Sequence, residues 1–274
     1  MPFRLAAVKT HRAFRVNRIR GQKMAETDQK GKVLILGATS DIAAACASQL
    51  AKEGRDLVLA ARNRAENERI ATDLRIRFKA KVETADFDAL KTESHKEFWK
   101  EHGAGVDTVI CAVGFLGDQQ KARHEPEYAD LIIRSNLNGV VSILGIIADD
   151  FEQRRSGNIA VISSVAGDRG RASNYVYGCA KAGLTAYLSG LRQRLYQAGV
   201  NVLTVKPGFV ATKMNEGMDL PKALTSSPEK AARMILKAIK RRKGEIYVTR
   251  LWWFIMAVIK SAPDFVFNKF MNKL

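Results

Sequence analysis

Short apolar runs alternate with longer amphipathic stretches along most of this 274-residue chain. The stretches between the runs, such as residues 42–54, 65–78 and 182–199, have the composition of helices. This alternation predicts an α/β protein with one doubly wound parallel sheet flanked by helices, whose ligands bind at the carboxyl ends of the strands. Seven runs have the length of buried parallel strands, and they are Lys32–Gly37, Asp56–Ala61, Val82–Asp86, Asp107–Gly114, Asn158–Ser164, Asn201–Gly208 and Glu245–Val248.

The length suits a single large domain and is short for two. No internal repeat or low-complexity linker divides the chain, so we expect one folded domain over residues 31–250, with a tail at 251–274. The three cysteines, Cys46, Cys111 and Cys179, lie in apolar runs without paired spacing. They predict neither a disulfide framework nor a metal site, and they fit a reducing, cytoplasmic compartment.

The net charge of +17 is concentrated at the two ends of the chain. Residues 1–30 carry eight basic and two acidic side chains and residues 213–274 carry 13 and 5, whereas residues 31–212 carry 24 and 21. A nearly neutral centre argues against a nucleic-acid groove. Residues 1–23 lack the apolar stretch of a secretory signal, which leaves an organelle presequence or a basic arm; Met24 also begins an ordinary chain start. We expect residues 1–30 to be a disordered basic extension.

The first predicted strand leads directly into Gly37-Ala38-Thr39-Ser40-Asp41-Ile42-Ala43 and then a helix. Small residues let the backbone approach a pyrophosphate, and the start of a helix offers free N–H groups. Of the usual three glycines only the first is present, because Asp41 and Ala43 occupy the other positions. The Asp41 carboxylate would repel a pyrophosphate unless it turns away, for example to cap the helix. An ordinary tight turn is the alternative interpretation.

The second predicted strand ends in Ala61-Arg62-Asn63, without the acid that usually holds the ribose hydroxyls of NAD. A guanidinium forms charge-assisted bonds with a phosphate, so Arg62 favours NADP(H) over NAD(H), although NAD(H) remains possible. The alternative is a solvated arginine at the start of a helix.

Tyr177 and Lys181 are one helical turn apart, and Ser164 ends the fifth predicted strand. A phenol with a pKa near ~10 is a weak acid, and a neighbouring ammonium favours its phenolate. We therefore expect Lys181 to lower the pKa of Tyr177, and Ser164 to donate a hydrogen bond to a substrate oxygen. The alternative is a tyrosine packed on a helix beside an exposed lysine.

Together and in this order, these motifs resemble the short-chain dehydrogenase/reductase family, a family of Rossmann-type oxidoreductases, over roughly Lys32 to Val248. The resemblance implies a catalytic set of Ser164, Tyr177, Lys181 and Asn136, in which Asn136 breaks the preceding helix and supports a proton relay to the lysine. Tyr175 cannot replace Tyr177, because Cys179 follows it at the lysine spacing.

The same resemblance implies the cofactor site. Asp86 would contact the adenine, and the segment from Pro207 to Thr212 would hold the nicotinamide carboxamide. The cofactor residues expected in full are Gly37, Thr39, Ser40, Asp41, Ile42, Arg62, Asp86, Ala112, Gly114, Tyr177, Lys181, Pro207, Gly208, Val210 and Thr212. The chain departs from the family in its glycine motif and in Cys111-Ala112-Val113-Gly114, where the family commonly has Asn-Asn-Ala-Gly.

More narrowly, the motifs resemble a bacterial subgroup that includes decaprenylphosphoryl-ribose 2-keto reductase, which reduces a keto-sugar on a lipid carrier. Two alternatives stay open: a reductase of a soluble carbonyl, acyl or steroid-type substrate, and a catalytically silent NADP-binding regulator. Members of the family are often homodimers or homotetramers, and we expect the same here.

The tail begins with nine consecutive apolar residues, Leu251 to Ile259, which are too few to span a bilayer. Trp252 and Trp253 suit a membrane interface, and a basic run precedes them at Lys237, Lys240, Arg241, Arg242 and Lys243. The tail is therefore a candidate for peripheral contact with the inner face of the membrane. It could instead pack on the core, cover the substrate cleft as a lid, or bury against another subunit.

Overall fold

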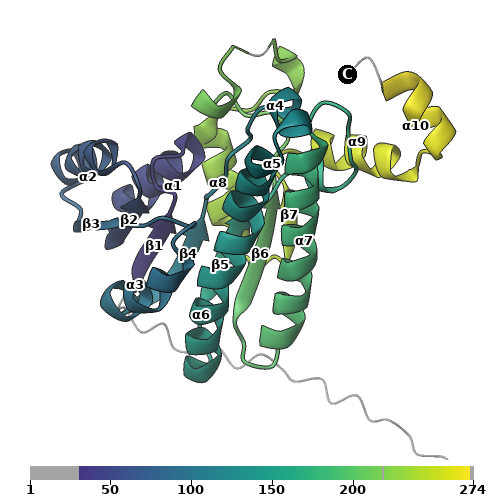
Figure 1. Ribbon diagram of the computed structural model, residues 1–274. Coiled ribbons are helices and arrows are strands. Elements are labelled where there is room, and N and C mark those ends of the chain that lie inside the picture. The colour runs from purple at the N-terminus through teal and green to yellow at the C-terminus, as the bar shows by residue number, and fades with distance from the viewer. Residues whose placement is uncertain (1–30, 218, 272–274) are drawn as a thin grey trace, which may run out of the picture.

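The computed structural model describes residues 31–217 and 219–271, so the predicted 1–30 extension lies outside the described residues. Its centre is one sheet of seven parallel strands in the order β3-β2-β1-β4-β5-β6-β7 (Figure 1). The predicted doubly wound sheet is therefore confirmed. The strands are β1 (Lys32–Leu36), β2 (Leu57–Ala61), β3 (Val82–Asp86), β4 (Val106–Cys111), β5 (Asn158–Ile162), β6 (Asn201–Lys206) and β7 (Glu245–Tyr247).

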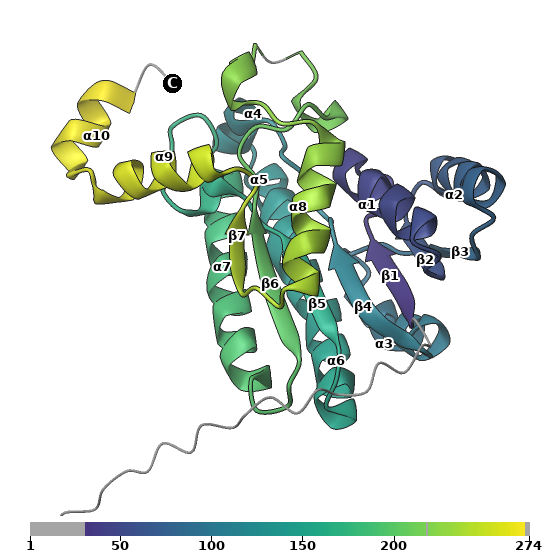
Figure 2. The same ribbon diagram turned by 180° about the vertical axis from the view of Figure 1, so that it is seen from behind.

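Helices cover both faces of the sheet (Figures 1 and 2). One face packs against α1 (Asp41–Lys52), α2 (Arg64–Phe78) and α8 (Pro228–Lys240). The other packs against α3 (His95–His102), α6 (Gly139–Arg154) and α7 (Tyr175–Leu195). The remaining helical segments are η1 (Thr92–Ser94), α4 (Gln119–His124), α5 (Pro126–Ile133), η2 (Arg134–Asn138), η3 (Val165–Gly167), η4 (Lys213–Asn215), η5 (Lys222–Leu224), α9 (Arg250–Ser261) and α10 (Asp264–Met271).

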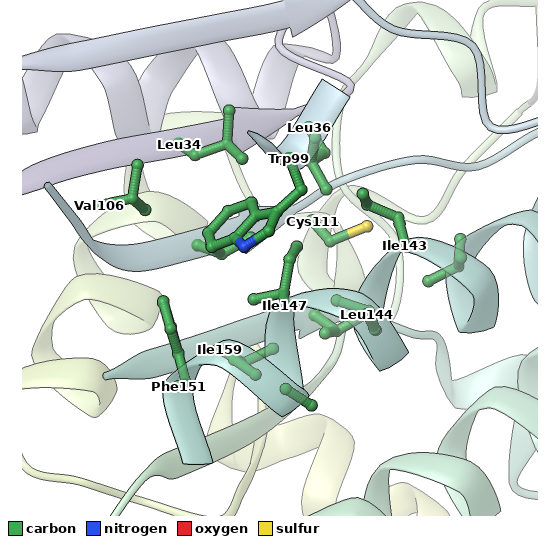
Figure 3. Packing of buried hydrophobic residues seen from close by; sticks show 14 of the residues in the cluster. Leu34, Leu36, Trp99, Val106, Cys111, Ile143, Leu144, Ile147, Phe151 and Ile159 are labelled. Atoms are coloured by element: carbon green, nitrogen blue, oxygen red, sulfur yellow. The ribbon is translucent and has the colours of Figure 1, made fainter. Parts of the chain in front are cut away.

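The core between the sheet and α3, α6 and α7 shows why the apolar runs become strands. Figure 3 shows Trp99 of α3 and Phe151 of α6 beside Leu34 of β1 and Val106 of β4. The Trp99 and Phe151 ring centroids are 5.9 Å apart, and the Trp99 indole N–H donates to Asp150 Oδ2 at 3.0 Å. Strands covered on both faces must be apolar throughout, which is the composition that the sequence showed.

One helical stretch, residues 126–154, is long and apolar enough to cross a membrane. It runs through α5, η2 and α6, and its apolar residues Val140, Ile143, Leu144 and Ile147 are fully buried against the sheet. The stretch is therefore a core helix of this domain.

The order of the strands reverses beside β1, which pairs with β2 on one side and β4 on the other. Such a reversal leaves a crevice at the carboxyl ends of the two strands, because their connections depart in opposite directions. Several strands also end earlier than predicted, at Leu36, Cys111, Ile162 and Lys206. The residues that follow them leave the sheet and line this crevice instead.

The predicted tail begins where α9 begins, since this helix starts at Arg250. Trp252 and Met256 are buried in a cluster with Val165. Figure 1 shows α9 leaving the domain beside the upper end of α7, with α10 extending further outward. The first tail helix therefore packs on the core, one of the arrangements left open by the sequence.

Candidate active site

A cavity of about 1540 Å³ lies at the carboxyl ends of the central strands. It brings together nearly all the residues predicted from sequence, although they come from five different connections between strands. The predicted residues that line it are Gly37, Thr39, Ser40, Asp41, Ile42, Arg62, Ala112, Gly114, Ser164, Tyr177, Lys181, Pro207, Gly208, Val210 and Thr212. Asp86 and Asn136 are the two that do not line it.

Gly37 forms the floor of the cavity where β1 ends. Its φ is +75°, and a Cβ atom there would lie 2.9 Å from the backbone carbon of Ala112. Only glycine tolerates both this conformation and this close approach. The one glycine retained from the usual motif is therefore at the position where the two central strands nearly touch.

The Asp41 carboxylate is used by the segment after β6 and does not cap α1. Its Oδ2 accepts a hydrogen bond of 2.7 Å from the backbone N–H of Lys213. Ser40 precedes the helix and makes no side-chain cap either. The start of α1 therefore keeps backbone N–H groups available for a phosphate, and the suggested capping role of Asp41 is wrong.

Arg62 is exposed at the rim of the cavity and forms no ion pair with any described residue. Its guanidinium is free to bind an anionic ligand.

Asp86 is placed differently from the prediction, because its carboxylate pairs with Arg64, whose Nε donates to Oδ1 at 2.6 Å. Phe87 and Asp88, the next two residues, line the cavity in its place. The predicted adenine contact by Asp86 is therefore not supported by the geometry.

Tyr177 and Lys181 both lie buried at the cavity, with exposed fractions of 8% and 2%. The Lys181 ammonium is 5.6 Å from the centroid of the Tyr177 ring, and it donates to the carbonyl of Ile162 at 3.2 Å. The spacing of one helical turn therefore does place both groups at the same site, as predicted.

The pKa of Tyr177 differs from the expectation. Burial raises it to about 12, and a hydrogen bond from Ser164 only partly opposes this. Burial lowers the pKa of Lys181 to about 8, with a small opposing effect from Cys111. Desolvation disfavours both charged forms, and it is the largest cause of each shift. Near pH 7 the phenol therefore carries its proton and the amine remains mostly an ammonium.

Asn136 does not break its helix but lies in η2, a π-helical turn that continues from α5 into α6. The side chain is fully buried, and its amide donates to Phe115 O at 2.6 Å and Ile132 O at 2.8 Å. A Cβ on Gly114 would lie 3.3 Å from Asn136 Oδ1 and 3.5 Å from Lys181 Nζ. Asn136 thus fixes the loop after β4 beside the lysine, from outside the cavity.

The segment after β6 is held by the tail. A Cβ on Gly208 would lie 1.9 Å from the Trp252 ring, so the indole packs directly on the Gly208 backbone. The Trp252 N–H donates to Leu224 O at 3.0 Å, and the ring contacts Phe209 edge-on at 5.2 Å. Trp252 and Ile255 also line the cavity. Helix α9 therefore forms part of the cavity wall near Pro207 and Gly208. Apolar composition alone could not distinguish this role from membrane contact.

Sequence reasoning missed a polar group at this end of the cavity, formed by Gln119, Arg171 and Asn174. No spacing motif marks these residues, because two lie in the loop before α7 and the third begins α4.

The residues present fit a dinucleotide. Gly37 allows close approach of a backbone-bound phosphate, the start of α1 is uncapped, and Arg62 lies unpaired at the rim. The cavity continues from this end to Tyr177, so one extended ligand could contact both regions.

Comparison with known proteins identifies the family. The short chain dehydrogenase family model matches residues 31–222. An uncharacterised oxidoreductase of Mycobacterium tuberculosis is 35% identical over 86% of this chain and 96% of its own length. Another from Streptomyces coelicolor is 33% identical over 86% and 94%. A short-chain dehydrogenase from Sphingobium yanoikuyae in complex with NADPH has the same fold, with a TM-score of 0.74, 24% identity, and coverage of 85% and 97%. The chain therefore belongs to the short-chain dehydrogenase family of oxidoreductases.

Proposed function

We propose that this protein is an NADP(H)-dependent oxidoreductase that reduces a carbonyl compound to an alcohol. The observation that carries the proposal is the buried phenol of Tyr177, which faces the cavity with Ser164 and Lys181 beside it. A pKa of about 12 keeps this phenol protonated at neutral pH, which suits a general acid. Reduction needs such an acid, because the carbonyl oxygen gains negative charge as the carbon accepts hydride.

In this mechanism Ser164 and Tyr177 hold the carbonyl oxygen, and Tyr177 transfers its proton to that oxygen. When bound, NADPH supplies the hydride. Lys181 keeps a positive charge near the phenol and favours the phenolate that remains after proton transfer. Asn136 keeps the loop around Gly114 in place, so that the lysine stays beside the site. The hydrogen bond between Asp41 and the Lys213 backbone joins the turn after β1 to the segment after β6. Both segments line the cavity.

The proposal is tested with the purified full chain. NADPH binding is followed by nucleotide fluorescence, and NADPH oxidation is then measured with a panel of soluble ketones, acyl substrates and steroids. We expect both binding and turnover. Tight NADPH binding without turnover on any carbonyl compound would favour the catalytically silent regulator instead.

The proposed preference for NADP(H) rests on the unpaired Arg62. We expect Arg62→Asp to weaken NADPH binding by at least about tenfold and to leave NADH binding within about threefold, because the new carboxylate repels a 2′-phosphate and accepts hydrogen bonds from ribose hydroxyls. The Kd values of both nucleotides measure the effect. Arg123→Gln removes an exposed charge outside the cavity and is the control. An unchanged ratio of the two Kd values in Arg62→Asp would contradict the assignment.

A second proposal is that the substrate is a keto-sugar on a lipid carrier and that the protein contacts the membrane surface. The support is the outer face of α9, where Trp253, Phe254 and Val258 are 60%, 61% and 57% exposed while Trp252 and Met256 face inward. Because α9 also lines the cavity, a lipid chain on this face would be close to the site. The basic run does not support membrane contact. It lies at the end of α8, before β7 begins, whereas α9 follows the opposite end of β7. Homodimers or homotetramers stay a prediction from the resemblance.

Vesicles of phosphatidylglycerol and phosphatidylcholine test the membrane proposal. We expect the full chain to sediment with them and the Trp253→Ser/Phe254→Ser double variant to lose at least about fivefold in bound fraction, because both aromatic rings leave the interface. Tyr196→Ser changes an even more exposed aromatic residue, at 76%, outside α9 and is the control. Light scattering of the same proteins shows whether this face joins two copies instead. Sedimentation that is absent, or unaffected by the double change, would contradict membrane contact.

A further inference from the structure

Arg171 has no partner that accounts for its position. It is half-buried and lines the cavity in the loop before α7, and it forms no ion pair with any described residue. Its Nε is buried without a hydrogen-bond partner, and Nη2 contacts only the sulfur of Met256, at 3.7 Å. A desolvated guanidinium with unused donors is costly unless a ligand satisfies it.

Arg169, two residues earlier in the same loop, is an arginine whose donors are paired with acceptors of the protein. It donates to the carbonyls of Ile259 and Ala262 at 2.7 and 2.5 Å and to Asp264 Oδ1 at 2.7 Å, so it fixes the turn between α9 and α10. Arg171 makes no such bonds, although both side chains face the same tail helix. Its side chain lines the cavity, and its Nε has no acceptor among the described residues.

Two further orphaned polar atoms belong to residues that line the same cavity. Gln119 uses its oxygen to accept from the Val176 N–H at 3.0 Å, which leaves Nε2 buried and unpaired. Asn174 precedes α7 without capping it, and its Oδ1 is also buried and unpaired. Three of the five orphaned side-chain atoms in the described residues thus belong to residues that line this cavity and meet at the start of α7. Such clustering indicates polar groups whose missing hydrogen bonds a bound ligand would supply.

We infer that Gln119, Arg171 and Asn174 form a substrate subsite for a carbonyl compound that carries a phosphate or carboxylate, with the anion on Arg171 and neighbouring oxygens on the two amides. This inference rests on the proposed carbonyl reduction and adds the substrate class to it. Tyr177 lies only one helical turn beyond Asn174, so the anion binds near the carbonyl. Arg62 is the other unpaired arginine of the cavity, and it serves the cofactor end.

Calorimetry tests this inference without requiring turnover. NADP⁺ is titrated first, and its failure to bind would count against the proposed function alone. Three ketones of similar size are then titrated into the protein with NADP⁺ present: 4-acetylphenyl phosphate, 4-acetylbenzoate and the neutral 4-methoxyacetophenone. We expect at least one anionic ketone to bind about tenfold or more tightly than the neutral one, because a charge-assisted bond to a half-buried guanidinium is strong. The two anions distinguish a phosphate from a carboxylate substrate.

Variants assign the effect to Arg171. Arg171→Gln should reduce the advantage of the anionic ketones to less than about twofold, and Arg171→Lys should keep part of it. Arg123→Gln, which removes an exposed charge on α4, should keep all of it. Thermal unfolding checks that each variant is folded. Equal binding of neutral and anionic ketones by the unmodified protein, no binding of any of them, or an advantage that survives Arg171→Gln would overturn the inference.

Discussion

Replacing Tyr177 with phenylalanine is expected to lower kcat for carbonyl reduction by about 10²–10⁴-fold, the contribution typical of a general acid. The change removes the proton donor and leaves the ring in place, in a residue that is only 8% exposed and lines the cavity. The Kd for NADPH should stay within about twofold, because the ring and Lys181 remain. Single-turnover oxidation of NADPH with a saturating ketone measures the chemical step directly.

Tyr175 provides a matched control for this experiment. It lies two residues earlier, is 44% exposed and does not line the cavity. Tyr175→Phe should therefore leave kcat within about twofold. A Tyr177→Phe enzyme that keeps more than about a tenth of the rate would show that another group donates the proton, and the role proposed for the tyrosine would then be wrong.

Local pattern was enough to predict the fold and the edge of the sheet where the cavity lies, and the family resemblance supplied most of its residues. Strands buried on both faces need continuous apolar runs, and the residues directly after Leu36, Cys111 and Ile162 must then meet at the same edge of the sheet. For that reason Gly37 and Ser164 could be assigned to one site without coordinates, whereas Ala112 came from the family resemblance. In a parallel sheet, a motif that directly follows a strand must lie at the carboxyl edge of that sheet.

Contacts between distant segments were outside the reach of this reasoning. Asp41 binds the backbone of Lys213, 172 positions away, and no helix-capping pattern could indicate that partner. Asp86 is used by Arg64, since α2 passes beside the end of β3. The significance of Arg171 depends on its having no ion pair with any described residue, which is a property of the three-dimensional surroundings. The raised pKa of Tyr177 likewise follows from burial that spacing alone does not reveal.

A buried charged network behind the active site was also invisible to sequence reasoning. Lys206 ends β6, and its ammonium lies 2.8 Å from Asp168 Oδ1 and 3.0 Å from Glu245 Oε2. The Tyr247 hydroxyl donates to Asp168 Oδ2 at 2.6 Å. The Lys206 and Asp168 side chains are each only 4% exposed. Asp168 follows η3, the turn that begins after Ser164, so the network joins β6 and β7 to the serine loop.

Asp168→Ala is expected to lower the free energy of unfolding by about 3–5 kcal/mol, the usual cost of removing one partner from a buried ion pair. Lys206 would keep a single, partly exposed carboxylate, and the Tyr247 hydroxyl would lose its acceptor. Urea denaturation followed by circular dichroism measures the loss. Asp264→Ala breaks a pair with Arg169 whose carboxylate is 94% exposed, and it should cost no more than about 1 kcal/mol. Similar losses in the two variants would mean that the Lys206 network contributes no more than a surface ion pair. A larger loss in Asp168→Ala that is partly restored in Asp168→Asn, which keeps an acceptor for Tyr247, would separate the hydrogen bond from the charge.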